Sequence, residues 1–415
     1  MAKITTNINH LRITGTLSIT DLHFLLAVIG RLVDKQGHET IILNFSQCAA
    51  TFAGPMLALA CQIMKRRALG IATELILPDD SVLARLFVNA NWAYLIDPEH
   101  HESSRFRGIT QVPATHFTSP PEQQTAVNVV MSALLGSLRE FSRSDLAAIE
   151  WSINEITDNV MVHAESPTGG LVQMTTFSRR QRRVEYAVCD AGVGIPASLR
   201  RGFPELTSDT DALFQAIREN VTRDKNIGQG NGLYGSYEVC RRSHGLFEIH
   251  SGAARLTQTE QRGLEIRREQ VPYAGTLVIA SVDYSEPHIL ADALAFGGKP
   301  FTPIDYIETR YEQRDANRIV FMMQQESPSV GSRLSGRPVR TKIENLLAMV
   351  ADARVSVDFA NVPLISSSFA DEVFGRLFVQ LGPTTFIQRI EFVNVSDTVR
   401  DLIDRAIAQR MATGR

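Results

Sequence analysis

The chain has 415 residues, which is enough for two or three domains of ordinary size. Hydrophobic residues make up 44% of it and charged residues 21%, as in a typical globular protein, and the net charge of −3 argues against the strong basic field of a general nucleic-acid binder. The four cysteines form no C-x-x-C pair, no apolar run is long enough to span a bilayer, and no signal peptide opens the chain. We therefore expect a cytoplasmic protein with reduced thiols and no membrane partner.

Strands and helices alternate over the first hundred residues. The predicted elements are a strand or hairpin over Ile4–Ile19, a helix over Asp21–Lys35, a strand over Ile41–Phe45, a helix over Phe52–Leu69, a strand over Glu74–Leu77 and a helix that starts at Pro78–Ser81 and ends near Asn89. This alternation predicts an α/β layer domain over residues 1–100. The polar stretch that follows, residues 101–121, is interpreted as a linker.

A long amphipathic helix is predicted to start near Ser144–Asp145, where Ser144 can cap the free N–H groups of the first turn. Its apolar stripe consists of Leu146, Ile149, Ile153, Ile156 and Val160. Glu155 and Asn159 are four residues apart and stack along one side, with Asn159 and His163 beside the stripe and Glu155 further round toward solvent. A carboxylate and a carboxamide so placed can hold a metal ion and an attacking water. The alternative is an ordinary solvated helix face.

Glycines gather in two segments beyond this helix. A strand over Val184–Val188 leads into Asp190-Ala191-Gly192-Val193-Gly194, and Gly228, Gly230 and Gly232 precede a helix that runs through Val239; a later strand over Gly275–Ala280 contains Thr276. An Asp-x-Gly-x-Gly sequence alone is more often a turn than a site. Glycines nevertheless allow close backbone approach, and successive N–H groups ahead of a helix form a concavity that binds anions.

In this order, the four segments resemble the ATP-binding domain shared by gyrase, MutL, histidine kinases and anti-sigma-factor kinases, the GHKL superfamily. The resemblance covers roughly residues 120–285. It implies an α/β fold, an α+β two-layer sandwich over residues 122–290, followed by a connector over residues 291–330. It also implies that ATP and Mg²⁺ are the ligands.

The resemblance assigns a role to each matching residue. Asn159 matches the Asn that coordinates the Mg²⁺ bound to the nucleotide phosphates, and Glu155 matches the acidic residue that activates water or the phosphoacceptor. Asp190 matches the Asp that accepts a hydrogen bond from the adenine amino group, and Thr276 matches the Thr that helps to fix adenine. The glycines match the family's two glycine boxes. Gly192 and Gly194 match the first box, which closes over the adenine base, and Gly228, Gly230 and Gly232 match the second, which flanks the phosphates.

The segment before the second glycine box departs from the family pattern. It holds a helical stretch, Asp211–Arg223, that the resemblance does not place. Arg218, Arg223 and Lys225 could reach the γ-phosphate, or they could form a solvated basic surface. The sequence leaves both alternatives open.

Residues 331–415 form a second α/β segment. The predicted elements are a turn over Ser335–Pro338, a helix over Thr341–Ala351, a strand over Val355–Phe359, a helix over Phe369–Leu381, a strand over Ile390–Val395 and a final helix capped by Ser396. Identical residues recur 317 positions apart in the first and last segments: Phe52 and Phe369, Ala53 and Ala370, Glu74 and Glu391, Asp80 and Asp397, Val82 and Val399. This constant offset favours an internal duplication over two similar folds that converged.

Both flanking segments resemble STAS domains, the fold of anti-sigma-factor antagonists. The resemblance implies a phosphorylatable Ser or Thr near a helix start, which would be Ser366, Ser367 or Ser368 in the second copy and Thr51 in the first. The alternative is capping, because Ser368 with Asp371 forms a capping-box pattern and Thr51 can cap its own helix.

Three functions fit these patterns. The chain could be a regulatory switch whose ATPase domain phosphorylates Ser or Thr on a STAS-type partner of a sigma/anti-sigma system, an ATP-gated homodimeric clamp of the gyrase and MutL type, or a scaffold that binds ATP without turning it over. Orthodox histidine-kinase activity is not expected, because His101-Glu102 has no Pro close behind it and His163, at a helix end, is interpreted as a capping or packing residue.

Overall fold

The computed structural model of the chain describes residues 2–106, 108, 110–139, 141–177, 182–222, 230–286, 288–290, 292–313, 318–327 and 329–413. The chain forms two compact units. Unit 1 consists of Met1–Val130 and Trp151–Phe301, and unit 2 of Met131–Glu150 and Thr302–Arg415. None of the described helices has the length and apolar content needed to cross a membrane.

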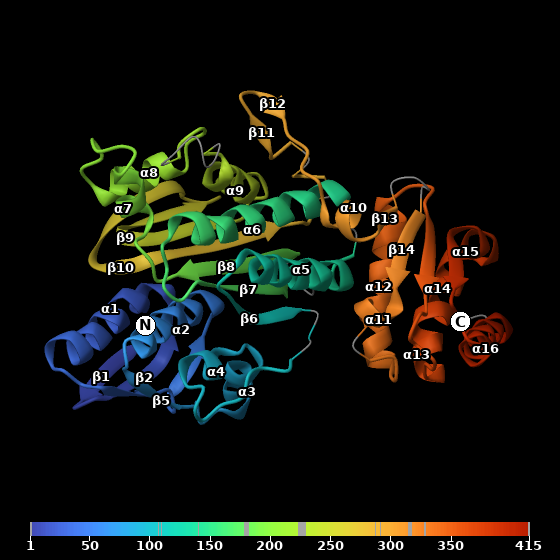
Figure 1. Cartoon of the computed structure of the whole chain (residues 1–415), viewed down its shortest axis with the longest axis horizontal. Helices are drawn as coiled ribbons and strands as arrows, with labels where there is room; N and C mark the ends of the chain where they lie inside the picture. Colours follow the sequence, from blue (N-terminus) through green and yellow to red (C-terminus); the bar gives the residue numbers. More distant parts are fainter. Residues whose placement is uncertain are drawn as a thin grey trace. The chain divides into compact units, whose positions relative to one another are not determined.

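Unit 1 opens with a mixed sheet in the order β1-β2-β3-β5 (Figure 1). Its strands are β1 (Lys3–Asn7), β2 (His10–Leu17), β3 (Thr40–Asn44), β4 (Cys48–Thr51), which pairs with β2, and β5 (Ala72–Ile76). Its helices are α1 (Ile19–Gly30), continued by the π-helical turn η1 (Arg31–Lys35), α2 (Ala53–Ala68), α3 (Ser81–Asn89) and α4 (Trp92–Ile96). The β1–β2 pair is antiparallel, whereas β2, β3 and β5 run parallel. The strands and helices predicted for the first hundred residues are confirmed.

A second sheet of unit 1 is antiparallel throughout, in the order β6-β7-β8-β10-β9. Its strands are β6 (Gln111–Phe117), which lies in the stretch interpreted as a linker, β7 (Gly170–Phe177), β8 (Arg183–Asp190), β9 (Leu246–Thr259) and β10 (Gly263–Asp283). The helices that follow or cover it are α5 (Pro120–Ser137), α6 (Arg143–His163), α7 (Ile195–Arg200), α8 (Asp209–Ala216) and α9 (Gly232–Arg242), and a hairpin of β11 (Ala295–Phe296) and β12 (Lys299–Pro300) ends the unit. The parts of α5 and α6 that belong to unit 1, residues 120–130 and 151–163, lie over one face of the sheet (Figure 1).

The other face of this sheet is covered by α2. Every residue of α2 from Gly54 to Met64 is buried, as expected for a helix that is apolar on all sides. One apolar cluster runs from the N-terminal sheet through α2 to residues of the second sheet such as Leu277 and Ile279. The side chain of Ile279 packs directly on α2, since a Cβ on Gly54 would lie 2.5 Å from Ile279 Cδ1. The N-terminal segment and the second sheet therefore share a hydrophobic core.

Unit 2 contains a four-stranded sheet in the order β13-β14-β15-β16. Its strands are β13 (Glu312–Gln313), β14 (Arg318–Met322), β15 (Arg354–Asp358) and β16 (Ile390–Val393). Its helices are α10 (Tyr306–Arg310), α11 (Met323–Glu326), α12 (Arg333–Met349), the continuous series α13 (Ser367–Ala370), η2 (Asp371–Gly375) and α14 (Arg376–Leu381), then α15 (Pro383–Arg389) and α16 (Asp397–Thr413). The first strand pair is antiparallel and the next two are parallel, which is the pattern of β1, β2, β3 and β5. The two segments share this topology, as a duplication predicts.

Two local predictions for unit 2 are wrong. Ser335–Pro338 is not a turn, because α12 begins at Arg333, with Ser332 as its N-cap. A proline inside a helix leaves the carbonyl four residues earlier without its donor. Here that carbonyl belongs to Leu334, which is 80% exposed and can bond to water. The predicted Ser368 cap is also wrong, because Ser366 Oγ accepts the N–H of Phe369 at 3.0 Å. Ser396 does cap α16, as predicted.

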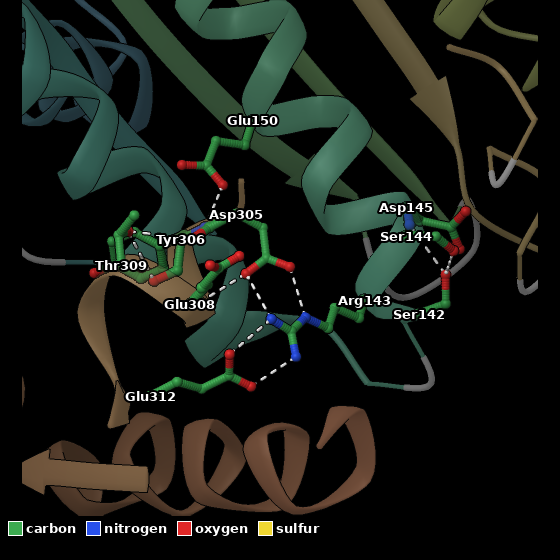
Figure 2. A network of polar contacts seen from close by, with 10 residues as sticks. All are labelled: Ser142, Arg143, Ser144, Asp145, Glu150, Asp305, Tyr306, Glu308, Thr309 and Glu312. Carbon is green, nitrogen blue, oxygen red and sulfur yellow. Dashed lines mark hydrogen bonds and ion pairs between the residues drawn. The ribbon is translucent and has the colours of Figure 1, made fainter. Parts of the chain in front are cut away.

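The first turns of α6 belong to unit 2 and are held by ion pairs (Figure 2). The guanidinium of Arg143 donates to Asp305 Oδ2 at 2.6 Å and to Glu312 Oε1 at 2.7 Å. The predicted cap Ser144 is wrong, since the helix starts at Arg143 and Ser142 Oγ accepts the N–H of Asp145 at 3.0 Å.

A second polar network lies in the core of unit 2. The Nζ of Lys342 donates to Glu326 Oε2 and to Ser132 Oγ, both at 2.7 Å, and both charged side chains are buried. Asn345 Nδ2 donates to the carbonyls of Leu135 and Leu138, each at 2.7 Å, and so satisfies carbonyls at the end of α5.

Candidate functional site

A cavity of about 430 Å³ in unit 1 brings most of the predicted site residues together. The predicted residues that line it are Glu155, Asn159, Asp190, Gly194, Gly230, Gly232 and Thr276. They come from five places in the chain: the last turns of α6, the end of β8, the start of α7, the start of α9 and β10. Gly192 is not among the lining residues, and Gly228 lies outside the described residues.

Asp190 is a buried carboxylate that lines the cavity. It is the last residue of β8 and is only 2% exposed. Its Oδ1 accepts the N–H of Gly192 at 2.8 Å, and Thr276 also hydrogen-bonds the carboxylate. Burial raises the pKa of Asp190 to about 6, and these hydrogen bonds limit the rise. The group is therefore charged at neutral pH, with lone pairs available to a ligand that donates a hydrogen bond.

The loop after Asp190 is fixed by its glycines. A Cβ on Gly192 would lie 1.9 Å from the carbonyl oxygen of Ala164, so that this position admits no larger residue. Gly194 has a φ of +79° and a Cβ there would lie 2.8 Å from the carbonyl oxygen of Gly275. Gly192 thus shapes the loop behind Asp190, whereas Gly194 also lines the cavity.

Ser251 ties this loop to β10 and was missed by the sequence analysis. Its Oγ accepts the N–H of Ile195 at 2.9 Å and donates to the carbonyl of Gly275 at 2.7 Å. The side chain is completely buried. A lone serine in the middle of β9 carries no local signal of such a role, because its partners are 56 and 24 residues away.

Glu155 and Asn159 lie on the side of α6 that lines the cavity. The prediction that Glu155 faces solvent is wrong, because the start of α9 covers that side of the helix. A Cβ on Gly232, the first residue of α9, would lie 2.4 Å from Glu155 Oε2. Burial, with a smaller contribution from the charge of Asp158, raises the pKa of Glu155 to about 7.

The segment before α9 holds a shorter helix than the sequence predicts. Helix α8 ends at Ala216, and the chain then turns so that Val221 N donates to the carbonyl of Gly230 at 3.2 Å. Gly230 has a φ of +76°, which favours glycine. Arg218 is exposed and its guanidinium lies over the ring of Phe214, rather than in the cavity. Arg223 and Lys225 lie outside the described residues.

Aromatic rings cover the cavity beside Glu155. Trp151, one turn before Glu155 on α6, lies 5.7 Å from Phe296 and 6.3 Å from Phe301, measured between ring centroids. All three rings line the cavity. Phe296 belongs to β11, and Phe301 directly follows β12. The sequence predicted only a connector over residues 291–330 and gave Phe296 and Phe301 no role in a site.

The candidate phosphoacceptors differ in exposure. Thr51 is the last residue of β4 and is 6% exposed, and its hydroxyl is buried with no hydrogen-bond partner among the described residues. The prediction that Thr51 caps α2 is wrong, because Phe52 occupies the N-cap position and no side chain bonds there. In the second copy, Ser366 caps α13, whereas Ser367 is exposed.

The two histidines that were considered as phosphoacceptors, His101 and His163, lie in different structural settings. His163 is the last residue of α6 and lines the cavity, whereas His101 lies outside the helices and strands. Among the described residues, no group of three or more His, Cys, Asp or Glu side chains could hold a metal ion. A Mg²⁺ ion held by one Asn and phosphate oxygens needs no such group.

Comparison with known proteins identifies part of the chain. Residues 335–400 match the STAS-like domain of unknown function DUF4325. The chain is also 35% identical over 85 residues to the adaptive-response sensory kinase SasA of Parasynechococcus marenigrum (strain WH8102), a match that covers 20% of this chain and 18% of that kinase. The chain thus spans less than a fifth of the length of this curated relative. The end of the chain is STAS-like, and these similarities are consistent with a regulatory, kinase-like role.

Proposed function

We propose that the chain is a regulatory protein that binds ATP and Mg²⁺ in the cavity of unit 1. One observation carries the proposal: a single cavity is lined both by a buried carboxylate, Asp190, and by the pair Glu155 and Asn159. Its volume of about 430 Å³ is in the ordinary range for small-molecule sites. The order of these residues in the chain supports the resemblance to the GHKL superfamily.

The part of the cavity lined by Asp190 suits the adenine base. The exocyclic amino group of adenine is a hydrogen-bond donor, and the charged, buried carboxylate is an acceptor that water reaches poorly. Thr276 hydrogen-bonds the same carboxylate and would orient it. Val188 and Val278, which are paired neighbours on β8 and β10, add apolar surface to the lining, which suits a flat ring.

The part lined by Glu155 and Asn159 suits the phosphates. Gly230 and Gly232 bring backbone N–H groups to the start of α9, where a helix favours negative charge. Asn159 would supply the protein ligand to Mg²⁺, which when bound offsets phosphate charge. Glu155, with its pKa near 7, could accept the proton of water or of a protein hydroxyl. Trp151, Phe296 and Phe301 limit the access of bulk water to this part.

The STAS-like end of the chain and the similarity to a sensory kinase support a switch rather than a metabolic enzyme. In the proposed switch, the ATP site transfers phosphate to Ser or Thr of a STAS-type protein, or controls its binding. The shared topology of the two flanking sheets supports a STAS-like fold for the N-terminal segment as well.

The test uses the purified chain, γ-labelled ATP and Mg²⁺, with Asn159→Ala and Glu155→Ala as variants. Binding is measured by calorimetry, and label is followed on protein and as free phosphate. The proposal expects binding that Asn159→Ala weakens, and transfer or release that Glu155→Ala abolishes. Label on Ser or Thr supports the kinase; free phosphate alone, with a mass that doubles only with nucleotide, supports the clamp. A wild-type chain that binds no ATP contradicts the proposal.

A further inference from the structure

Helix α2 of the N-terminal segment contacts both loops beside Asp190. The Nζ of Lys65 donates to the carbonyl oxygen of Ala191 at 2.7 Å. One turn earlier, Gln62 Nε2 donates to the carbonyl oxygen of Ala274 at 2.5 Å. Lys65 and Ala191 are 126 positions apart in the chain, and Gln62 and Ala274 are 212 positions apart. The fold, and not the local sequence, therefore brings these groups together.

Each of these two carbonyls is next to the proposed base-binding residues. Ala191 directly follows Asp190, and Ala274 comes two residues before Thr276. The two loops also touch each other, because a Cβ on Gly275 would lie 2.2 Å from the carbonyl oxygen of Asp190. Gly275 has a φ of +105°, which a larger residue would not readily adopt. The position of one loop therefore depends on the position of the other.

We propose that Lys65 and Gln62 are positioning residues of the nucleotide site, so that the N-terminal segment completes the base-binding part. This inference rests on the proposed ATP function. Neither side chain touches the cavity; each acts through a backbone carbonyl beside Asp190 or Thr276. The N-terminal segment is then a part of the site and not only a docking module beside it.

The burial of α2 makes this arrangement rigid. The helix is fixed by the shared core over Gly54–Met64, and Gln62 is 3% exposed. A buried amide has few alternative partners, and leaving it unpaired is unfavourable because it has lost its hydrogen bonds to water. The carbonyl of Ala274 is thus held by a side chain that cannot turn to water.

Lys65 also acts on Asp190 through its charge. The groups that face Asp190 are Lys65 from α2, Tyr273 from β10, whose hydroxyl lies 3.4 Å from the carbonyl oxygen of Asp190, and Cys189 from β8. Burial raises the pKa of both Tyr273 and Cys189 well above their ordinary values, so these two are neutral near pH 7. The cation of Lys65 lowers the pKa of Asp190. Its removal would raise that pKa further.

The experiment compares Lys65→Met and Lys65→Arg in the full chain. The control is Arg67→Met, because Arg67 lies on the same helix and donates to the carbonyl of Leu95 at 2.9 Å, away from the cavity. Calorimetric titration with Mg·ATP between pH 5 and 8 should show about tenfold weaker binding for Lys65→Met. The pH below which binding is lost should also rise, and Lys65→Arg should restore both properties.

A second readout needs no nucleotide. Hydrogen exchange of the amides at residues 190–194 should be faster in Lys65→Met than in the wild type, and unchanged in Arg67→Met. If Lys65→Met does not fold, Gln62→Met tests the other contact by the same exchange at residues 274–276. The inference would be overturned if Lys65→Met bound Mg·ATP with the affinity and pH dependence of the wild type and showed the same rate of hydrogen exchange. A wild-type chain without ATP binding would refute the proposed function, while the exchange experiment would still decide whether Lys65 positions the loop.

Discussion

Replacing Gly232 by Ala should move Glu155 without harming the fold. Gly232 is the first residue of α9 and has an ordinary helical φ, so alanine introduces no backbone strain there. Its Cβ, however, would lie 2.4 Å from Glu155 Oε2 and 3.2 Å from Glu155 Cβ. The carboxylate must therefore shift away from α9.

The size of the shift follows from these distances. An ordinary contact begins at 3.4 Å, so the oxygen must move by about 3.4 − 2.4 = 1.0 Å. A misplacement of about 1 Å in a catalytic group can lower turnover by roughly 100-fold. The free energy of unfolding should stay the same or rise by up to about 1 kcal/mol, because alanine is the better helix former.

The assay is ATP turnover or protein labelling, with ATP affinity and thermal unfolding measured on the same sample. The matched control is Gly136→Ala in α5, where a Cβ would meet its nearest atoms at an ordinary 3.4 Å. Gly232→Ala should lose turnover and keep affinity, and Gly136→Ala should keep both. Wild-type turnover in Gly232→Ala would refute the assignment of Glu155 as the group that accepts the proton.

Three further predictions concern stability. Asp190 has a pKa of about 6 in the fold against an ordinary 3.8, so its contribution to stability is present below pH 4 and is lost as the pH rises through 6. The free energy of unfolding, measured with urea at each pH, should therefore fall by about 3 kcal/mol over this range in the wild type. Asp190→Asn should remove this fall. Glu326→Leu leaves the cation of Lys342 buried without its carboxylate, removes the acceptor of Arg310 and Tyr311, and should cost about 3–5 kcal/mol. Adding Lys342→Met should recover the part that is due to Lys342, and equal losses in the single and double variants would contradict this. Ser142→Ala should lower the free energy of unfolding by about 1 kcal/mol, because it removes the cap of α6, and Ser144→Ala should lower it clearly less. Thermal unfolding measures both losses, and a larger loss in Ser144→Ala would support Ser144 as the cap instead.

The local patterns of the sequence predicted most of the elements. The apolar stripe of α6 is a stripe of buried residues, and the strand before Asp190 and the helix after Gly232 exist as predicted. The reason is that period and turn chemistry are properties of neighbouring residues. Their order in the chain also suggested that Glu155, Asn159 and Asp190 share one site, and they line one cavity. Their roles toward ATP stay predictions.

The sequence could not show what depends on distant contacts. The orientation of Glu155 is set by α9, which begins 77 residues later, and helical periodicity contains no information about that neighbour. The role of Lys65 was also out of reach, since nothing near it in the chain points to Ala191, 126 residues away. The sequence predicted Ser144 as the cap of α6, and only the geometry shows that Ser142, two residues earlier, accepts the N–H of Asp145.

The burial of α2 between two sheets also bears on how such a chain can evolve. A fragment of residues 122–290 made alone would leave Leu171, Leu277 and Ile279 on a bare sheet face, and a patch of that kind promotes aggregation. Recombination can exchange a module only while both of its faces remain polar. Because α2 is buried between the two sheets, we expect the first segment to be kept together with the cavity, and any partner specificity of that segment to be inherited with it.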